Sequence, residues 1–356
     1  MSEVRAKKAL GQHFLVDLNI ARKICDALSG GVRPEAGAET RAVAAGSADA
    51  DAETRTRVAG YAGAGAEART MAAGSADAGA ETRAVAAGSA DADAETRRGV
   101  AASADARLAA DTTAAGAPAA AEEERSGAVP CDVLEVGCGM GVLTQFLLRR
   151  GDITTYGAEI DPESVEYLHA HFPEFAPRLI EGDFLKMNLR ERFPRGLKII
   201  GNFPYNISSQ IFFKVLEHRD LVPECVGMIQ KEVAVRIAEP PGSKEYGILS
   251  VLLQAWYDIE YLFTVNETVF NPPPKVKSAV IRLRRNSVGR LGCDEALFVK
   301  VVKASFGQRR KMIRNSLRAV FGDFGGAEHP FFTQRAEQLS VADFVQLTDW
   351  VAANRK

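Results

Sequence analysis

Short apolar runs alternate with segments of helical periodicity from Cys131 onward, and this alternation constrains the fold more than any other feature. The strand-like runs are DVLEV (132–136), TTYGAEI (154–160), RLIEGD (178–183), KIIGN (198–202) and ECVGMIQ (224–230). The helical patterns between them are VLTQFLLRR, a segment from Pro162, and SSQIFFKVLE. Because parallel strands need long crossover connections, the alternation predicts βαβ units around a mainly parallel sheet, and so an α/β fold.

Three other segments complete the predicted fold. Two further strand-like runs, 255–265 and 278–285, follow without a long helix between them, so we expect an antiparallel pair at one sheet edge. After Asn286 the pattern becomes helical up to the C-terminus. Near the N-terminus, 12–28 contains a short motif and then a helix. The apolar positions predicted for that helix are Leu18, Ile20, Ile24 and Leu28.

A tandem repeat separates that first helix from the first strand of the sheet. AETRAVAAGSADADAETR occurs at 38–55 and again, unchanged, at 80–97, with degenerate copies between them at a period of 14 residues. The copies bury too little apolar surface to offset the entropy cost of ordering. We predict a disordered insertion over 35–127. Its ends should lie near each other at the surface, at an edge close to the cofactor site.

The segments give four predicted regions. They are an N-terminal motif and helix of the catalytic domain (1–34), the insertion (35–127), the main catalytic domain (128–285) and a small helical C-terminal domain (286–356). The insertion holds 16 acidic and 9 basic residues, a net charge of −7, whereas the whole chain carries −2. The remainder therefore carries +5, which favours a polyanionic partner.

Composition argues against several other classes. No stretch approaches the roughly 20 apolar residues that span a membrane. The charged start lacks the apolar segment of a signal peptide. The five cysteines have no metal-binding spacing, and His169 and His171 would face different sides of a helix. We expect a cytoplasmic protein with no metal site.

A glycine-rich turn follows the first strand of the sheet. In VLEVGCGMG, Gly137, Gly139 and Gly141 let the backbone come close to a ligand. Glu159 ends the second strand, where a carboxylate can accept hydrogen bonds from ribose hydroxyls. Asp183 ends the third, where it can reach an adenine amine. The spacing differs from the dinucleotide fingerprint, and no phosphate-binding lysine accompanies it. The pattern favours S-adenosylmethionine over NAD or ATP.

Asn202-Phe-Pro-Tyr205 follows the fourth strand. An adenine amine is a poor nucleophile because its lone pair is delocalised into the ring. The Asn202 amide oxygen and the Pro204 carbonyl can accept its N–H bonds and stabilise the positive charge that develops on transfer. Tyr205 offers a face for stacking an unpaired base. The motif indicates methyl transfer to an adenine amine.

The chain outside the insertion resembles the ribosomal RNA adenine dimethyltransferases, in particular their bacterial small-subunit branch. The matching stretches are Lys8–Asp17, Leu134–Gly141, Gly182–Phe184, Asn202–Tyr205, Tyr246–Val251, Phe270–Ser278 and Phe306–Lys311. The resemblance implies a class I, Rossmann-like methyltransferase sheet with a small all-helical C-terminal domain. It implies dimethylation of two adjacent adenosines in a hairpin near the 3′ end of small-subunit (16S) rRNA, on a pre-30S particle, by a monomeric protein that takes part in small-subunit biogenesis.

The resemblance also implies particular site residues. Family cofactor contacts fall on His13, Leu15, Gly137, Glu159, Asp183 and Asn202. Phe270 falls where the family places a second aromatic ring, so the target base would lie between Phe270 and Tyr205. The family commonly has Asn at the position of His13.

Basic residues gather near the C-terminus, and we expect them to contact RNA phosphates. They are Lys303, Arg309, Arg310, Lys311, Arg314 and Arg318. Arg310, Arg314 and Arg318 repeat every four residues and would share one face of a continuous helix.

Three alternative functions remain open from the sequence. A large-subunit rRNA adenine methyltransferase of the macrolide-resistance type would share the glycine turn and the Asn202 motif, although Tyr246–Val251 and the 308–311 segment favour the small-subunit enzyme. A non-catalytic ribosome assembly factor would retain the fold, but Asn202, Tyr205 and Glu159 are intact. A DNA adenine methyltransferase would more often carry Asp-Pro-Pro-Tyr and an added DNA-reading domain.

Overall fold

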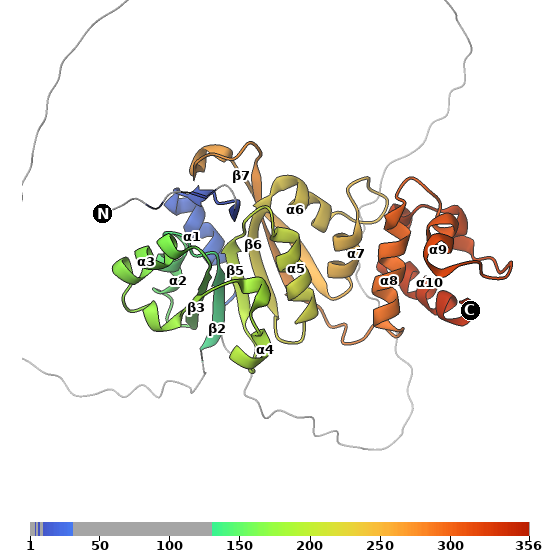
Figure 1. Cartoon of the computed structure of the whole chain (residues 1–356), viewed down its shortest axis with the longest axis horizontal. Coiled ribbons are helices and arrows are strands. Elements are labelled where there is room, and N and C mark those ends of the chain that lie inside the picture. The colour runs from blue at the N-terminus through green and yellow to red at the C-terminus, as the bar shows by residue number, and fades with distance from the viewer. Residues whose placement is uncertain (1–3, 5, 8–9, 31–129, 356) are drawn as a thin grey trace, which may run out of the picture. The chain divides into compact units, whose positions relative to one another are not determined.

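The computed structural model describes residues 4, 6–7, 10–30 and 130–355, which belong to one compact unit (Figure 1). The predictions made for 35–127 lie outside these residues. No helix in the described part of the chain combines the length and apolarity needed to cross a membrane.

The strands confirm the predicted α/β class. They are β1 (Phe14–Leu15), β2 (Cys131–Val136), β3 (Ile153–Glu159), β4 (Leu179–Glu181), β5 (Lys198–Asn202), β6 (Glu224–Gln230), β7 (Tyr257–Val265), β8 (Phe270–Asn271) and β9 (Ser278–Arg285). Among the described residues, seven strands form one sheet in the order β4-β3-β2-β5-β6-β9-β7, and β1 pairs with β8. The first five are parallel, and β9 runs antiparallel to both β6 and β7. The expected antiparallel pair therefore closes one edge.

Helices flank the sheet and extend beyond it. They are α1 (Leu18–Ala27), α2 (Thr144–Leu147), α3 (Pro162–His171), α4 (Leu189–Arg192), α5 (Ser208–Glu217), α6 (Lys231–Ala238), α7 (Ile248–Gln254), α8 (Glu295–Gly307), α9 (Ile313–Phe321) and α10 (Val341–Asn354). Single 3₁₀ turns cover Ala176–Arg178, Phe184–Lys186, Glu267–Val269, Pro330–Thr333 and Ala336–Gln338. Side chains cap the N-terminal ends of several helices. The Asp17 carboxylate, for example, accepts from the first N–H groups of α1.

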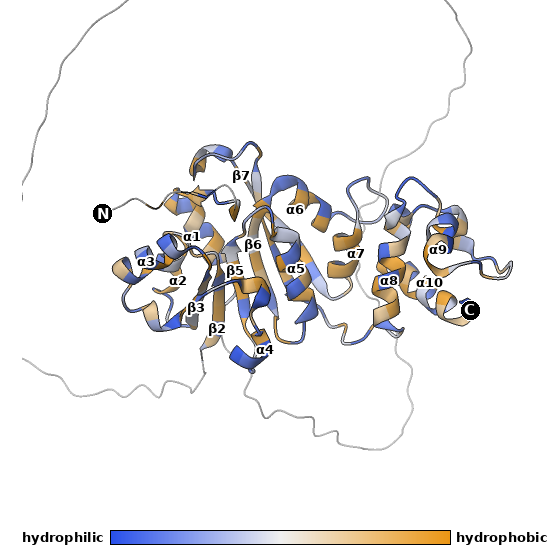
Figure 2. Ribbon diagram, in the orientation of Figure 1, coloured by the Kyte–Doolittle hydropathy of each residue, from blue (hydrophilic) through white to orange (hydrophobic). Residues whose placement is uncertain are grey.

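Alternate residues of the central strands face opposite layers of helices. In β2, Val133 packs into the cluster that contains α1 and α2, whereas Leu134 packs into the cluster that contains α5 and α7. Both side chains are fully buried. Figure 2 shows the central strands coloured as hydrophobic. Burial on both faces is what a parallel sheet between two helical layers requires.

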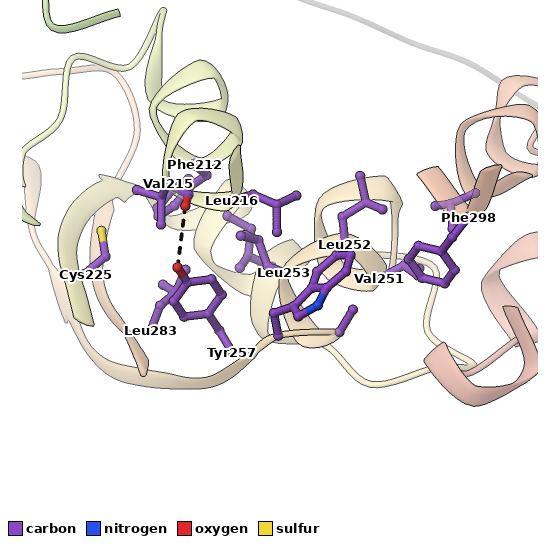
Figure 3. Close-up of a cluster of buried hydrophobic side chains, with 14 of the residues drawn as sticks. Phe212, Val215, Leu216, Cys225, Val251, Leu252, Leu253, Tyr257, Leu283 and Phe298 are labelled. Atoms are coloured by element: carbon purple, nitrogen blue, oxygen red, sulfur yellow. Dashed lines mark hydrogen bonds between the residues drawn. The ribbon is translucent and has the colours of Figure 1, made fainter. Parts of the chain in front are cut away.

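The core continues from the sheet into the C-terminal helices (Figure 3). Trp256 stacks edge-to-face on Phe298 of α8, with ring centroids 6.0 Å apart. Tyr257 is buried beside them, and its hydroxyl donates to the Val222 carbonyl over 2.9 Å. These buried aromatic contacts tie α8 to the end of the sheet.

The predicted apolar face of α1 was partly wrong. The buried residues of the helix are Ala21, Ile24 and Cys25, while Leu18 is 51% exposed. Six residues span about 1.7 turns, so Leu18 and Ile24 point to different sides of the helix. The helical period of 3.6 residues therefore does not place these two side chains on one face of α1.

The described chain breaks off at Gly30 and resumes at Pro130, at the amino end of the parallel strands. Gly30 follows α1, and an added Cβ on it would lie 3.3 Å from Asp152, which directly precedes β3. Cys131 begins β2 and pairs with Ile153 at the start of β3. The glycine turn follows the other end of β2, about 20 Å away for a strand of this length. The points where the described chain breaks off and resumes are therefore neighbours, about a strand's length from the glycine turn.

Cationic side chains hold the segment that ends at Gly30. The Lys198 ammonium donates to the carbonyls of Ser29 (3.0 Å) and Gly30 (3.1 Å) and pairs with buried Glu224 at 3.1 Å. Arg150 donates to the Leu28 carbonyl over 3.0 Å. Leu28, Ser29 and Gly30 follow the end of α1, and these cations supply hydrogen-bond partners to their carbonyls.

Candidate active site

A cavity of about 200 Å³ lies at the carboxyl ends of β2, β3 and β5. The chain order reverses between β2 and β5, and open α/β sheets bind ligands at such a point. The segment 10–15 lines the cavity from the N-terminal side. Nine of the predicted site residues line it, namely His13, Leu15, Gly137, Gly139, Glu159, Asp183, Asn202, Pro204 and Tyr205.

The glycine turn has a backbone that only glycine adopts readily. Gly137, Gly139 and Gly141 have φ angles of +77°, +54° and +75°. Gly141 does not line the cavity. A Cβ on it would approach the Phe172 ring to 2.4 Å, so this glycine allows the end of α3 to pack against the turn.

Glu159 ends β3 as a buried acceptor for backbone N–H groups. One carboxylate oxygen accepts from Gly139 over 2.8 Å, and the other accepts from Ile160 and Asp161, each over 2.9 Å. Burial raises the pKa of Glu159, and these three hydrogen bonds oppose the rise. A carboxylate has about four acceptor positions, so roughly one stays open toward the cavity.

Asp183 lies on the same edge of the sheet, after β4. It caps the 3₁₀ turn Phe184–Lys186 by accepting from the Leu185 N–H over 2.9 Å. Its second carboxylate oxygen lies 4.0 Å from the exposed Lys186 ammonium. Asp183 and Phe184 both line the cavity.

Asn202 is the last residue of β5, and its amide has a fixed orientation. The Nδ2 group donates to the His13 carbonyl over 2.9 Å. A carbonyl can only accept, so the amide nitrogen must face it. The Oδ1 atom is therefore the side of the amide left to accept a hydrogen bond from a ligand.

Tyr205 forms an aromatic pair with His13. The rings stack with centroids 5.3 Å apart and an interplanar angle of 29°. The Tyr205 hydroxyl bonds the Ser278 hydroxyl over 2.5 Å, and burial raises the pKa of the phenol. The His13 Nδ1 donates to the Pro272 carbonyl over 2.9 Å. The His13 side chain thus connects three segments around the site.

Phe270, which the resemblance places near the target base, is a buried residue of β8. It is 3% exposed and does not line the cavity. The reason is its strand: β8 pairs with β1 through Leu15, and the ring of Phe270 packs into the core beneath α1. The ring next to Tyr205 is that of His13.

The structure also identifies cavity residues that sequence reasoning missed. Glu135, the penultimate residue of β2, is 1% exposed and accepts from the Thr144 hydroxyl over 2.6 Å. Burial raises its pKa to about 8. An acid directly after the apolar pair Val133-Leu134 was the available signal.

A second missed contact fastens the N-terminal segment. Lys7 pairs with Asp161 and, at 3.1 Å, with Glu163. Burial acts to raise the pKa of Asp161, but hydrogen bonds from Lys7, Ser164 and Gln12 hold it below the usual value. The ion pair anchors the segment 10–15 beside Glu159.

We expect Glu135→Gln to remove a loss of stability that develops with rising pH. An acid whose folded pKa is raised to about 8 costs nothing below its unfolded pKa of 4.5; stability is lost as pH rises above 4.5, and the loss is complete near pH 8. The difference should reach a few kcal/mol by about pH 8 and stay constant above it. Urea unfolding of both proteins from pH 5 to 9, without ligand, measures it. A stability difference that stays constant with pH would contradict the buried neutral acid.

The predicted RNA-contacting residues do not share one helix face. The helix is interrupted after Gly307, and α9 starts at Ile313 after an extended Met312. Arg310 therefore lies in the turn, apart from Arg314 and Arg318.

Their contacts also differ. Arg314 pairs with Glu328 at 2.6 Å, and Arg318 pairs with Asp323 at 3.2 Å. Arg309 donates to the Tyr246 carbonyl over 3.1 Å, and Lys303 lies over the Phe213 ring at 5.5 Å. Arg310 and Lys311 are exposed in the turn.

The sequence of this chain is similar to those of rRNA methyltransferases. The model of the ribosomal RNA adenine dimethylase family matches residues 130–353. The ribosomal RNA small subunit methyltransferase A of Parabacteroides distasonis is 61% identical over 218 residues, which cover 61% of this chain and 81% of that protein. The protein of the same name from Bacteroides thetaiotaomicron is 59% identical over 221 residues, covering 62% and 82%.

A solved structure has a similar fold. The crystal structure of a dimethyladenosine transferase from Plasmodium falciparum is 25% identical, with a TM-score of 0.53, and the match covers 63% of this chain and 90% of that one. The match of the family model to more than half of the chain, together with these similarities, leads to one conclusion: this chain belongs to the ribosomal RNA adenine dimethylase family.

Proposed function

We propose that the chain transfers methyl groups from S-adenosylmethionine to the N6 amines of two adjacent adenosines in a 3′-end hairpin of small-subunit (16S) rRNA. The observation that carries the proposal is the fixed amide of Asn202, which leaves an acceptor oxygen at a cavity that also holds Glu159 and Asp183. The names of the relatives from Parabacteroides and Bacteroides support the small subunit as substrate.

The cavity residues fit an adenosine-containing cofactor. Glu159 would bind a ribose hydroxyl, and Asp183 the adenine amine. The turn through Gly137 and Gly139 allows close approach of the ligand to the backbone. When bound, S-adenosylmethionine supplies an electrophilic methyl group on a sulfonium. His13 and Leu15 would cover it from the N-terminal segment, with Gly141 supporting the turn.

The chain's own contribution to transfer is to hold and polarise the amine. The Asn202 amide oxygen and the Pro204 carbonyl accept its two N–H bonds, which stabilises the positive charge that grows on nitrogen. Tyr205 would stack on the base, with His13 behind its ring. Phe270, which is buried, would contribute by supporting the β1–β8 pair. Alignment of the reacting groups can contribute up to about 7–11 kcal/mol, so the mechanism requires no general base.

The exposed cations of the 308–311 turn would contact RNA phosphates, together with Lys303, Arg314 and Arg318 at its sides. The target bases must leave their stack, so recognition would rest on RNA shape and unpaired loops. We place the protein in the cytoplasm as a monomer acting on pre-30S particles, without a metal ion. Residues 286–356 would form the C-terminal domain that carries these cations, beside the catalytic domain at 1–34 and 128–285.

The test is methyl transfer from labelled S-adenosylmethionine to isolated small and large ribosomal subunits that lack these modifications, followed by nucleoside analysis. We expect dimethyladenosine in small-subunit rRNA alone. Label in large-subunit rRNA would assign the chain to the resistance-type enzymes. Absence of label from both, with cofactor bound, would indicate an assembly factor without catalysis.

A further inference from the structure

Lys214 is a buried lysine that contacts two residues of the cavity lining, Phe184 and Leu185, and no step proposed above uses it. It lies in α5, and its side chain is 9% exposed. Its ammonium donates to the carbonyls of Leu185 (2.8 Å) and Met187 (2.7 Å). It also lies 5.5 Å from the centre of the Phe184 ring. Burying an ammonium is costly unless such partners compensate, so these contacts define the position of the side chain.

The contacts fall on the turn that presents Asp183. This 3₁₀ turn, Phe184–Lys186, follows the three-residue strand β4 at the edge of the sheet. A single 3₁₀ turn leaves its last carbonyls without partners and is weak by itself. Lys214 supplies partners to two carbonyls at that end, while Asp183 caps the beginning. Residues 182–185, which overlap this turn, line the cavity.

The same helix also carries the amine-binding motif. α5 begins at Ser208, whose hydroxyl donates to the Tyr205 carbonyl over 3.2 Å. Lys214 follows less than two turns later. One rigid helix therefore contacts the Tyr205 loop at its start and the Asp183 turn further along.

We propose that Lys214 is a positioning residue that fixes the adenine-recognising turn 182–185 relative to the amine-binding motif. The inference rests on the proposed function, because it assumes that Asp183 recognises the adenine of the cofactor. Lys214 touches neither ligand. It acts by fixing the carbonyls of Leu185 and Met187, and so the direction of the Asp183 carboxylate.

The experiment measures ligand affinity rather than turnover. S-adenosylhomocysteine and S-inosylhomocysteine, which lacks the adenine amine, are titrated calorimetrically into wild type, Lys214→Met and Lys214→Arg. We expect Lys214→Met to lose about 10- to 100-fold in affinity for the adenosyl ligand, because two hydrogen bonds to a charged group disappear. Affinity for the inosyl ligand should change much less, so the preference for adenine falls. Lys214→Arg, which keeps cationic donors, should restore most of that preference.

Lys198→Met is the matched control. Lys198 is equally buried and also donates to two backbone carbonyls, but it lies at the opposite end of the strands. The control should lower the unfolding temperature and leave the ratio of the two affinities unchanged. A further expectation is non-additivity: Lys214→Met combined with Asp183→Ala should bind the adenosyl ligand no more weakly than Asp183→Ala alone.

The inference and the proposed function would fail in different ways. A Lys214→Met protein that is less stable but keeps the wild-type preference for adenine overturns the inference and makes Lys214 a core residue only. If Lys214→Met does not fold, Lys214→Gln takes its place with the same criterion. Failure of the wild type to bind S-adenosylhomocysteine would contradict the proposed function itself, and so is distinct from the failure of Lys214.

Discussion

Asn202→Ala is expected to reduce methyl transfer by about 10³-fold or to below detection, because it removes a fixed acceptor that acts on the developing positive charge. The Nδ2 group is held by the His13 carbonyl, so the wild-type acceptor is fixed in place before the amine arrives. The measurement is initial rate on small subunits at saturating cofactor. RNA binding, followed by filter retention, should stay within about twofold of wild type, because RNA affinity comes mainly from phosphate contacts.

Asn202→Asp tests whether an acceptor oxygen is enough without the hydrogen bond that orients the side chain. The variant keeps an acceptor oxygen but turns a carboxylate oxygen toward the His13 carbonyl, so partial activity is expected. Gln210→Ala, on the exposed side of α5, serves as the control and should transfer methyl groups at the normal rate. Turnover by Asn202→Ala comparable with that of the control would exclude the amide oxygen from the mechanism.

Glu159→Ala is expected to weaken S-adenosylhomocysteine binding by about 100-fold or more, since a ribose contact and the support of the glycine turn disappear together. Glu159→Gln should be nearly as damaging. Both carboxylate oxygens accept from backbone N–H groups, so one end of an amide would place a donor against a donor. Calorimetric titration of the three proteins gives the affinities.

A ligand variant distinguishes a ribose contact from support of the turn. Removing one ribose hydroxyl from the ligand should weaken binding to wild type and have little further effect on Glu159→Ala. An equal loss in both proteins would mean that Glu159 only holds Gly139 and its neighbours. The unfolding temperature without ligand reports that structural contribution separately.

The central strands could be predicted from sequence because burial on both faces produces uninterrupted apolar runs. The limits of β6, α5 and β9 coincide with the predicted segments. Site residues at strand ends were predictable for a related reason, because parallel strands bring their carboxyl ends to one edge. That rule places Glu159, Asp183 and Asn202 around one cavity without any knowledge of side-chain contacts.

Contacts between distant segments were not predictable. The stacking of His13 on Tyr205 depends on a β1–β8 pairing of two residues per strand, which is too short to leave a periodic signal. Helices α6 and α7 were missed, and the break between α8 and α9 contains no proline. The sequence shows Glu135 only as one residue of a strand. Its raised pKa could not be predicted, because it results from burial by other elements.

The junction between Gly30 and the start of β2 has a practical consequence. The described chain breaks off at Gly30 and resumes just before β2, and the segment that ends at Gly30 is held by Lys198 and Arg150. The entropy cost of closing a loop grows slowly, by about 0.6 kcal/mol for each doubling of its length. Such a junction should accept a reporter domain or an affinity tag as a genetic fusion. The fused partner would then lie about one strand's length from the candidate active site. Neither chain terminus would be needed for the fusion.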